Sequence, residues 1–273
     1  MTYERSLTEL RAEIDSHLES VLKPADKDRL TAARETVDEY DDRKYGQLLM
    51  LSFESIATPA SRDPGTVLPA ATAVELLRGY CRLRSELLIQ FDNGIAHSLT
   101  RDPMPALLSG DYLYTSAYSA LSEINNAHLG ACFETLTAVQ ESVIGALSTN
   151  YSSTPTAPDC RSFIDDTAGV LGEGAAVIGA TLAGVDSTHR QHFATVGRGF
   201  GTGHQIQLTF GSGGGDVLSV FQGSEERELR QHAEKRLDEA EKSLCHLSSA
   251  YDTSFLRTFV EGTGSGSVHG VSD

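Results

Sequence analysis

The chain has 273 residues, of which 40% are hydrophobic, enough to bury the core of one large domain. It carries 38 acidic and 22 basic residues, only five of them lysine, has no tryptophan, and has a formal net charge of −16. Such a field repels phosphate and argues against a nucleic-acid partner and an anionic membrane surface. A salt-rich (halophilic) cytoplasm is the simplest explanation of this acidity, and an ordinary acidic mesophilic protein is the alternative.

The cysteines and the hydropathy of the chain indicate the cellular compartment in which the protein is expected. The four cysteines are scattered and form no CxxC pair, so we expect them to be reduced. Residues 1–22 carry charges throughout and lack the apolar core of a signal peptide. The weakly charged run 168–185 contains Glu173 and is mostly Ala and Gly, too weakly apolar to span a bilayer. The sequence therefore predicts a cytoplasmic protein without a membrane span.

Apolar residues recur at helical spacing along the whole chain, and no stretch shows sustained strand alternation. The first helix is expected over 6–22, ended by Pro24. The next ones are expected over 26–40 and 47–56, with a break near Gly46 and then a loop over 59–69. Two long neighbouring helices follow within 68–121. The second has Asp102 as its N-cap and Pro103 at its first position, where the missing N–H costs nothing.

The later helices complete an all-α prediction. They are expected over 124–147, 160–185, 187–208, 225–247 and 249–260. Asp159 and Ser224 are expected N-caps of the second and fourth of these. The Gly- and Ser-rich end, 261–273, predicts a disordered tail. We therefore expect a single helical domain over 1–260.

Gly110 and Asp111 interrupt a run of good helix formers. The pair is unfavourable by up to about 1 kcal/mol relative to Ala, so close packing or a site must explain it. It belongs to an ordered set of segments: AxAxELLxxY, ALLSGDYLYxxAYxxL, YDDRKYGQLLML, RSFIDDTAGVLGEGAAVIGATLAGV and VGRGFGTGHQIQ. Together they resemble the trans-isoprenyl diphosphate synthase (polyprenyl synthetase) family over residues 5–260. The resemblance implies a bundle of about ten or more helices around a central cavity.

The resemblance also implies a metal site. In that family two Asp-rich DDxxD clusters on facing helices bind Mg²⁺, which holds the substrate diphosphate and neutralises its developing charge. The first cluster corresponds here to residues 85–89, where Glu86 is the one acid and Asp92 a stand-in two turns along. The second corresponds to 208–212, which has none. The resemblance thus predicts degenerate Asp-rich motifs and no confident catalytic residue, with Glu86, Asp92, Asp111 and Gln205 as vestigial candidates.

The diphosphate-binding bases are altered as well. The lysine of the family's Lys-Thr pair corresponds to Asp166, which would repel phosphate. In the stretch that corresponds to the family's GGKRxRP motif, Arg43 and Lys44 remain as candidate substrate-binding residues, whereas the second arginine corresponds to Gly46. What the family uses for packing is kept better than what it uses for chemistry.

Three histidines were weighed separately. His189 and His192, with Asp186 nearby, have the spacing of a transition-metal site, and a solvated helix start explains them as well. His204 is expected to be a packed or lining residue. The glycine-rich run 197–203 follows a helix and not a strand, so it does not predict a nucleotide site.

Two hypotheses about function remain. The first is a non-catalytic or regulatory prenyl-synthase-like protein of isoprenoid biosynthesis, without a cofactor, that pairs with itself or with a catalytic prenyl synthase. The second is an active polyprenyl diphosphate synthase with an atypical Mg²⁺ site at Glu86, Asp92 and Asp111. A carrier of an apolar ligand such as an isoprenoid is a further interpretation. The family's subunit interface corresponds to 105–147. This span carries more apolar and aromatic residues than a single core-facing stripe requires, so we expect a dimer.

Overall fold

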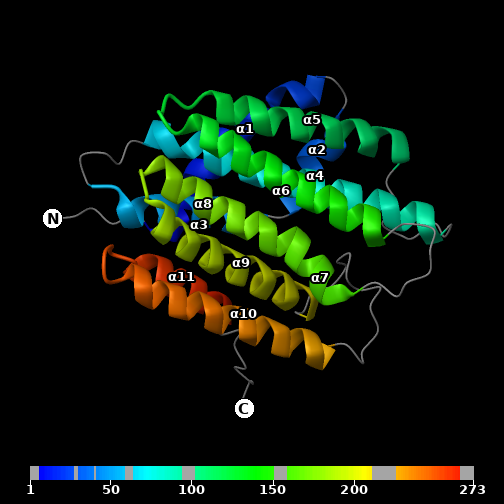
Figure 1. Cartoon of the computed structure of the whole chain (residues 1–273). Helices are drawn as coiled ribbons and strands as arrows, with labels where there is room; N and C mark the ends of the chain where they lie inside the picture. The colour runs from blue at the N-terminus through cyan, green and yellow to red at the C-terminus, as the bar shows by residue number, and fades with distance from the viewer. Residues whose placement is uncertain are drawn as a thin grey trace, which may run out of the picture.

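The computed structural model describes residues 6–27, 30–39, 41–58, 64–93, 102–150, 159–210 and 226–264. Within these ranges every regular element is a helix (Figure 1), which confirms the predicted all-α class. The elements are α1 (Leu7–Lys27), α2 (Thr31–Glu39), α3 (Lys44–Ile56), α4 (Pro64–Asn93), α5 (Pro103–Ser122), α6 (Leu129–Asn150), α7 (Cys160–Ile164), the π-helical segment η1 (Asp165–Gly169), α8 (Val170–Leu182), α9 (Ser187–Phe210), α10 (Glu226–Leu247) and α11 (Ser254–Gly264).

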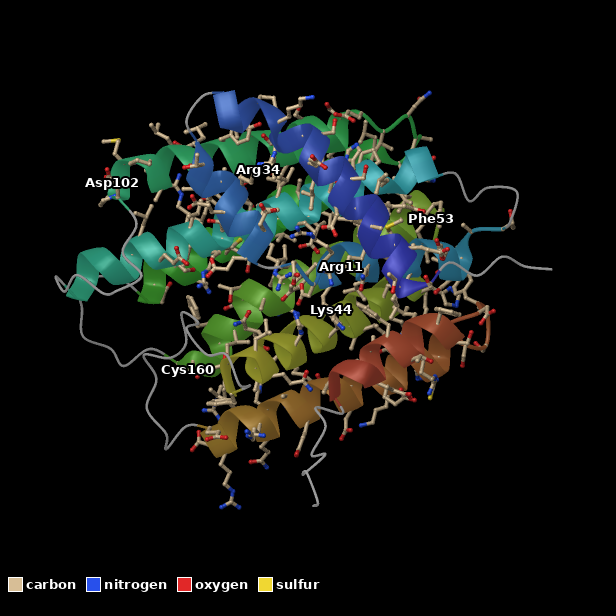
Figure 2. The ribbon with its side chains drawn as sticks, turned by 180° about the vertical axis from the view of Figure 1, so that it is seen from behind. Arg11, Arg34, Lys44, Phe53, Asp102 and Cys160 are labelled. Carbon is tan, nitrogen blue, oxygen red and sulfur yellow. The ribbon has the colours of Figure 1, made fainter. Side chains whose placement is uncertain are left out.

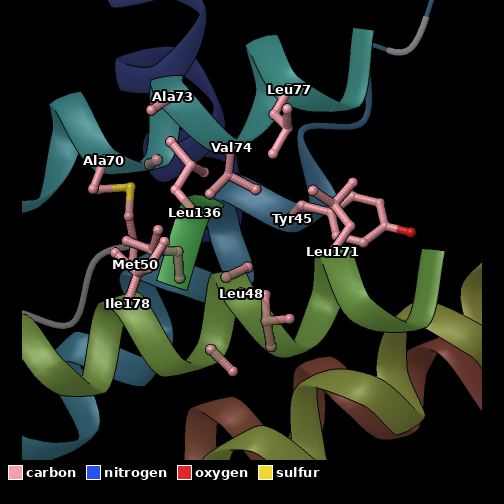
Figure 3. Close-up of a cluster of buried hydrophobic side chains, with 14 of the residues drawn as sticks. Tyr45, Leu48, Met50, Ala70, Ala73, Val74, Leu77, Leu136, Leu171 and Ile178 are labelled. Atoms are coloured by element: carbon pink, nitrogen blue, oxygen red, sulfur yellow. The ribbon is translucent and has the colours of Figure 1, made fainter. Parts of the chain in front are cut away.

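Helix α3 lies at the centre of the bundle. Its nine consecutive residues from Tyr45 to Phe53 are all buried, because α1, α4, α8, α9 and α11 all pack against it. Figure 3 shows its side chains Leu48 and Met50 between α4 and α8. A helix enclosed on every side needs no polar face, which explains the unbroken apolar run from Leu48 to Leu51 in α3.

Glycines allow the backbone of α8 to contact the backbones of α3 and α9 directly. A Cβ on Gly172 of α8 would lie 2.2 Å from the carbonyl oxygen of Gly197 on α9. A Cβ on Gly179 would lie 2.1 Å from the carbonyl oxygen of Leu49 on α3. The glycine-rich run 197–203 therefore serves helix packing, as its place after a helix indicated.

The predicted pair of long helices within 68–121 is confirmed as α4 and α5, which pack along each other (Figure 1). The side chain of Asp102 accepts a hydrogen bond from the backbone N–H of Met104 at 3.3 Å, so it is the N-cap of α5 as expected. Gly110 does not mark a tight contact, since an added Cβ would meet Arg84 only at 3.7 Å.

Several predicted boundaries were wrong. Helix α1 continues through Pro24 to Lys27, because burial of Leu22 and Ala25 offsets the lost backbone hydrogen bond. Gly46 lies inside α3, and the break falls at Arg43, whose φ of 47° is left-handed. Helix α4 begins already at Pro64, a residue suited to the first helical position.

Further boundaries differ in the second half of the chain. Helix α6 starts at Leu129, after a turn in which the Asn126 side chain accepts from the N–H of His128 at 2.8 Å. The helix expected over 160–185 is divided by η1, and Asp159 caps its start as predicted. Helix α11 ends at Gly264, and the rest of the predicted tail, like Ser224, lies outside the described residues. None of the described helices combines the length and the apolar character that crossing a membrane requires.

Candidate functional site

Four charged or titratable side chains meet in the interior where α3, α4 and α9 converge: Asp42, Glu75, Arg78 and His204, here called the interior charge cluster. The Arg78 guanidinium donates to Asp42 Oδ1 at 2.5 Å and lies 3.6 Å from Glu75. Nε2 of His204 lies 2.9 Å from Asp42 Oδ2. The N–H of Gly46 donates to Glu75 at 2.7 Å. Each member of the cluster is thus held by another element of the fold.

In this cluster, burial and the positive charge of Arg78 shift the pKa values of the two acids in opposite directions. Burial by itself would raise the pKa of Asp42, but Arg78 and then His204 hold that pKa well below its usual range. Burial lowers the pKa of His204, and the hydrogen bond to Asp42 offsets this only in part. Burial raises the pKa of Glu75, opposed by Arg78. We therefore assign a neutral His204 that donates from Nε2 to an ionised Asp42.

The two predicted substrate-binding residues both make contacts within the fold. Buried Arg43 donates from Nε to Asp15 of α1 at 2.6 Å and from Nη1 to the carbonyl of Val37 on α2 at 2.5 Å. Lys44 begins α3, and its ammonium lies 5.0 Å from the centroid of the Phe259 ring on α11 (Figure 2). Arg43 thus ties α1 and α2 to the start of α3, and the substrate-binding role of both residues stays a prediction.

The vestigial acid candidates lie at the outer part of α4 and on α5. Arg82 donates to Glu86 one turn along α4, and Arg84 donates to Asp111 across the contact with α5. Asp92 belongs to α4, and its side chain lies outside the described residues. Gln205 follows His204 on α9 and is half-buried.

A second buried acid, Asp165, lies in η1. It accepts hydrogen bonds from Thr202 of α9 at 2.9 Å, His232 of α10 at 3.0 Å and Arg236 at 2.5 Å. Asp166, the residue that the resemblance placed at the phosphate site, is exposed instead. A π-helical turn carries one residue more than an α-turn, so it shifts which side chain faces inward.

The comparisons with known proteins agree with one another. No family model matches the chain. It is 30% identical over 159 residues to the (2E,6E)-farnesyl diphosphate synthase of Mycobacterium tuberculosis, covering 55% of this chain and 44% of that protein. It is 29% identical over 195 residues to the short chain isoprenyl diphosphate synthase of Methanocaldococcus jannaschii, covering 66% and 59%. The chain thus spans about half the length of the curated relatives it matches.

The solved structures show the same fold. The geranylgeranyl pyrophosphate synthetase of the archaeon Geoglobus acetivorans superimposes with a TM-score of 0.70 at 19% identity, over 94% of this chain and 96% of that one. The chain is thus similar in sequence to isoprenyl diphosphate synthases and shares their all-α fold. A further structural neighbour, at a TM-score of 0.62 and 17% identity over 85% of this chain and 91% of that one, is the geranyl diphosphate synthase small subunit of Antirrhinum majus.

The described acids of this isoprenyl diphosphate synthase relative do not fit a Mg²⁺ cluster. The carboxylates of Glu86 and Asp111 are each engaged by a guanidinium, which neutralises them. Among the residues with described side chains, no three His, Cys, Asp or Glu residues are placed to hold a metal ion. His189 bonds to Asp186 at 2.5 Å, whereas His192 stacks on His246 of α10 with ring centroids 4.9 Å apart.

Sequence reasoning missed most of the interior charge cluster. Glu75 follows Ala71 by four residues on the core-facing side of α4, and a charged residue at a core-spaced position is the signal that could have found it. No sequence pattern marks Asp42 and Arg78, because these two residues are 36 positions apart and come together only in the folded chain. His204 was predicted to be packed or lining, and it is 5% exposed.

Proposed function

We propose that this protein is a non-catalytic or regulatory subunit of isoprenoid biosynthesis that acts in the cytoplasm. The observation that carries the proposal is the pairing of Glu86 with Arg82 and of Asp111 with Arg84. A guanidinium bound to a carboxylate competes with Mg²⁺ for that oxygen and for the negative charge. The printed sequence also contains no DDxxD string. Both features support a chain that does not release diphosphate with the metal ligands that the resemblance implies.

Exposed apolar side chains support a role as one subunit of a pair. Met104, Leu107 and Leu108 of α5 and Ile144 of α6 are exposed, and Met104 keeps 61% of its surface in solvent. Two structural neighbours come from heteromeric enzymes, the A. majus small subunit and the heterotetrameric geranyl pyrophosphate synthase of mint. We therefore include a second subunit in the proposal, either another copy or a catalytic prenyl synthase.

The proposal is tested by incubating the purified chain with Mg²⁺, isopentenyl diphosphate and geranyl diphosphate, at low and at high salt. We expect neither a longer prenyl diphosphate nor free pyrophosphate. Losing about 4 kcal/mol of transition-state charge stabilisation costs roughly a thousandfold in rate. Turnover that Glu86→Ala abolishes and the exposed control Glu19→Ala leaves intact would instead establish the active synthase with an atypical metal site.

A further inference from the structure

A groove of about 560 Å³ opens on the surface between α6, α8 and α9. The apolar part of its lining, here called the apolar floor, consists of Ala138 and Val139 of α6, Val170 and Val177 of α8, and Ala194 of α9. The polar residues Thr135, Ser142, Ser187 and Gln191 also line the groove. The volume falls in the range of roughly 300–1,000 Å³ that small-molecule sites occupy. The groove is therefore large enough to cover a short hydrocarbon body.

The charges on the groove's rim do not balance. Arg198 donates from Nε to Glu173 at 2.7 Å and from Nη1 to the carbonyl of Asp165 at 3.3 Å, so Arg198 and Glu173 neutralise each other. Arg190 also lines the groove. Its Nε is buried and finds no acceptor among the described residues. One cationic charge thus remains at the groove, in a chain whose net charge is −16.

Cys132 of α6 lies within electrostatic reach of Arg190 but gives it no counter-charge. Burial raises the pKa of Cys132 on α6 to about 12, although Arg190 opposes the shift. The Cys132 side chain is therefore a neutral thiol at pH 7. A buried guanidinium N–H without an acceptor is unfavourable, and an anion at the groove would supply both the acceptor and the charge.

We propose that this groove binds a small amphiphilic anion, with Arg190 holding the anionic head and the apolar floor covering the hydrocarbon body. A fatty carboxylate and an alkyl phosphate share this chemistry. The proposal goes beyond the function proposed above and does not rest on it, because neither Glu86 nor any other residue of that argument lines the groove.

The test is isothermal titration of the full chain with octanoate and with octyl phosphate, which separates the two head groups. Octanol and inorganic phosphate are titrated as the neutral and the purely ionic comparison. We expect at least one of the two amphiphilic anions to bind at least tenfold more tightly than either comparison. Binding of neither anion, or equal binding of octanol, overturns the proposal.

Three variants locate the site. Arg190→Gln should weaken binding at least tenfold, whereas Arg161→Gln, an exposed arginine on α7, should leave it unchanged. Ala138 is exposed on α6, so Ala138→Phe should fill the groove and abolish binding without disturbing the core, as circular dichroism would show. If Arg190→Gln and Ala138→Phe leave octanoate and octyl phosphate binding intact but change the sedimentation of the protein, the groove is an interface between copies and the proposal is wrong.

Discussion

Buried Arg78 faces two carboxylates at once, half-buried Asp42 at 2.5 Å and fully buried Glu75 at 3.6 Å. Removing one partner of a buried ion pair leaves the other charge uncompensated, which costs about 3–5 kcal/mol, whereas an exposed pair contributes about 0–1 kcal/mol. We therefore expect Arg78→Met to lower the free energy of unfolding by about 3–5 kcal/mol in urea titrations. Arg84→Met, which breaks the more exposed pair with Asp111, should cost at most about 1 kcal/mol. Equal losses would contradict the assignment of Arg78 as the central cation.

The lowered pKa of His204 predicts a pH dependence of stability. The unfolded chain takes up a proton on this residue near pH 6.5, while the folded chain does not, so the free energy of unfolding should fall as the pH drops below about 6.5. Urea midpoints measured between pH 8 and 5 should depend less on pH in His204→Gln than in the unmodified protein. The exposed His128→Gln is the control, and comparing variants cancels the contributions of other groups. Identical slopes in all three proteins would contradict the lowered pKa of His204 in the folded state.

Sequence patterns predicted some site residues and not their geometry. Arg43 and Lys44 follow from the resemblance, but the left-handed backbone at Arg43 that buries its guanidinium depends on contacts with Asp15 and Val37. Asp166 was expected inside and Asp165 is found there, because the π-helical turn changes the register and leaves no periodicity to read.

At the scale of elements, the packing of α8 on α9 depends on missing side chains. A Cβ at position 172 would lie 2.2 Å from a carbonyl oxygen, and overpacking of this kind costs typically about 1–3 kcal/mol or more. We therefore expect Gly172→Ala to lower the free energy of unfolding by at least about 1 kcal/mol, measured from the urea midpoint. Gly145 on α6 has no atom within 4 Å of an added Cβ, so Gly145→Ala should stabilise the protein by about 0.5–1 kcal/mol. Stabilisation by both substitutions would contradict the close α8–α9 contact.

Helical periodicity predicted which segments are helices, because each segment presents an apolar face to the core. It could not predict where they end. Pro24 and Gly46 are both typical helix breakers, but each lies inside a helix because of its packing. Ala25, next to Pro24, is fully buried, and a Cβ on Gly46 would lie 2.9 Å from Ile14. These are tertiary contacts, and they override local preference.

For the whole molecule, the predicted interface on α5 and α6 needs refinement. The apolar residues expected to form its excess surface are Tyr112, Tyr114, Tyr118, Leu121, Leu129, Phe133 and Leu136. Leu121 and Leu136 belong to the core, and the other five pack partly buried against it. The large apolar side chains that are exposed on these two helices are Met104, Leu107 and Leu108 in the first turns of α5 and Ile144 of α6. The order of motifs along the chain was sufficient to predict the fold, whereas the Arg84–Asp111 ion pair joins two helices and no motif encodes it. The Arg82–Glu86 pair has i, i+4 spacing on one helix and could have been predicted.

A prediction for assembly follows from that surface. If α5 forms the subunit contact, Leu108→Asp should shift the protein toward a monomer in light scattering, because a charge would be buried at the contact. Phe255→Asp, which changes a similarly exposed apolar residue on α11, should leave the molecular mass unchanged. A monomer already in the unmodified protein, combined with failure to bind any prenyl synthase, would remove the dimer hypothesis.

The bond between Asp42 and His204 joins positions 162 residues apart, and Arg78 connects it to a third helix. If α9 detached while the N-terminal helices stayed folded, Asp42 would lose an interior partner and water would reach α3 along its length. Partial opening is therefore disfavoured relative to opening of the entire bundle. Slowly exchanging amide hydrogens of α4 and of α9 should consequently share one exchange free energy, equal to that of global unfolding, so the chain behaves as one cooperative unit despite its many helices.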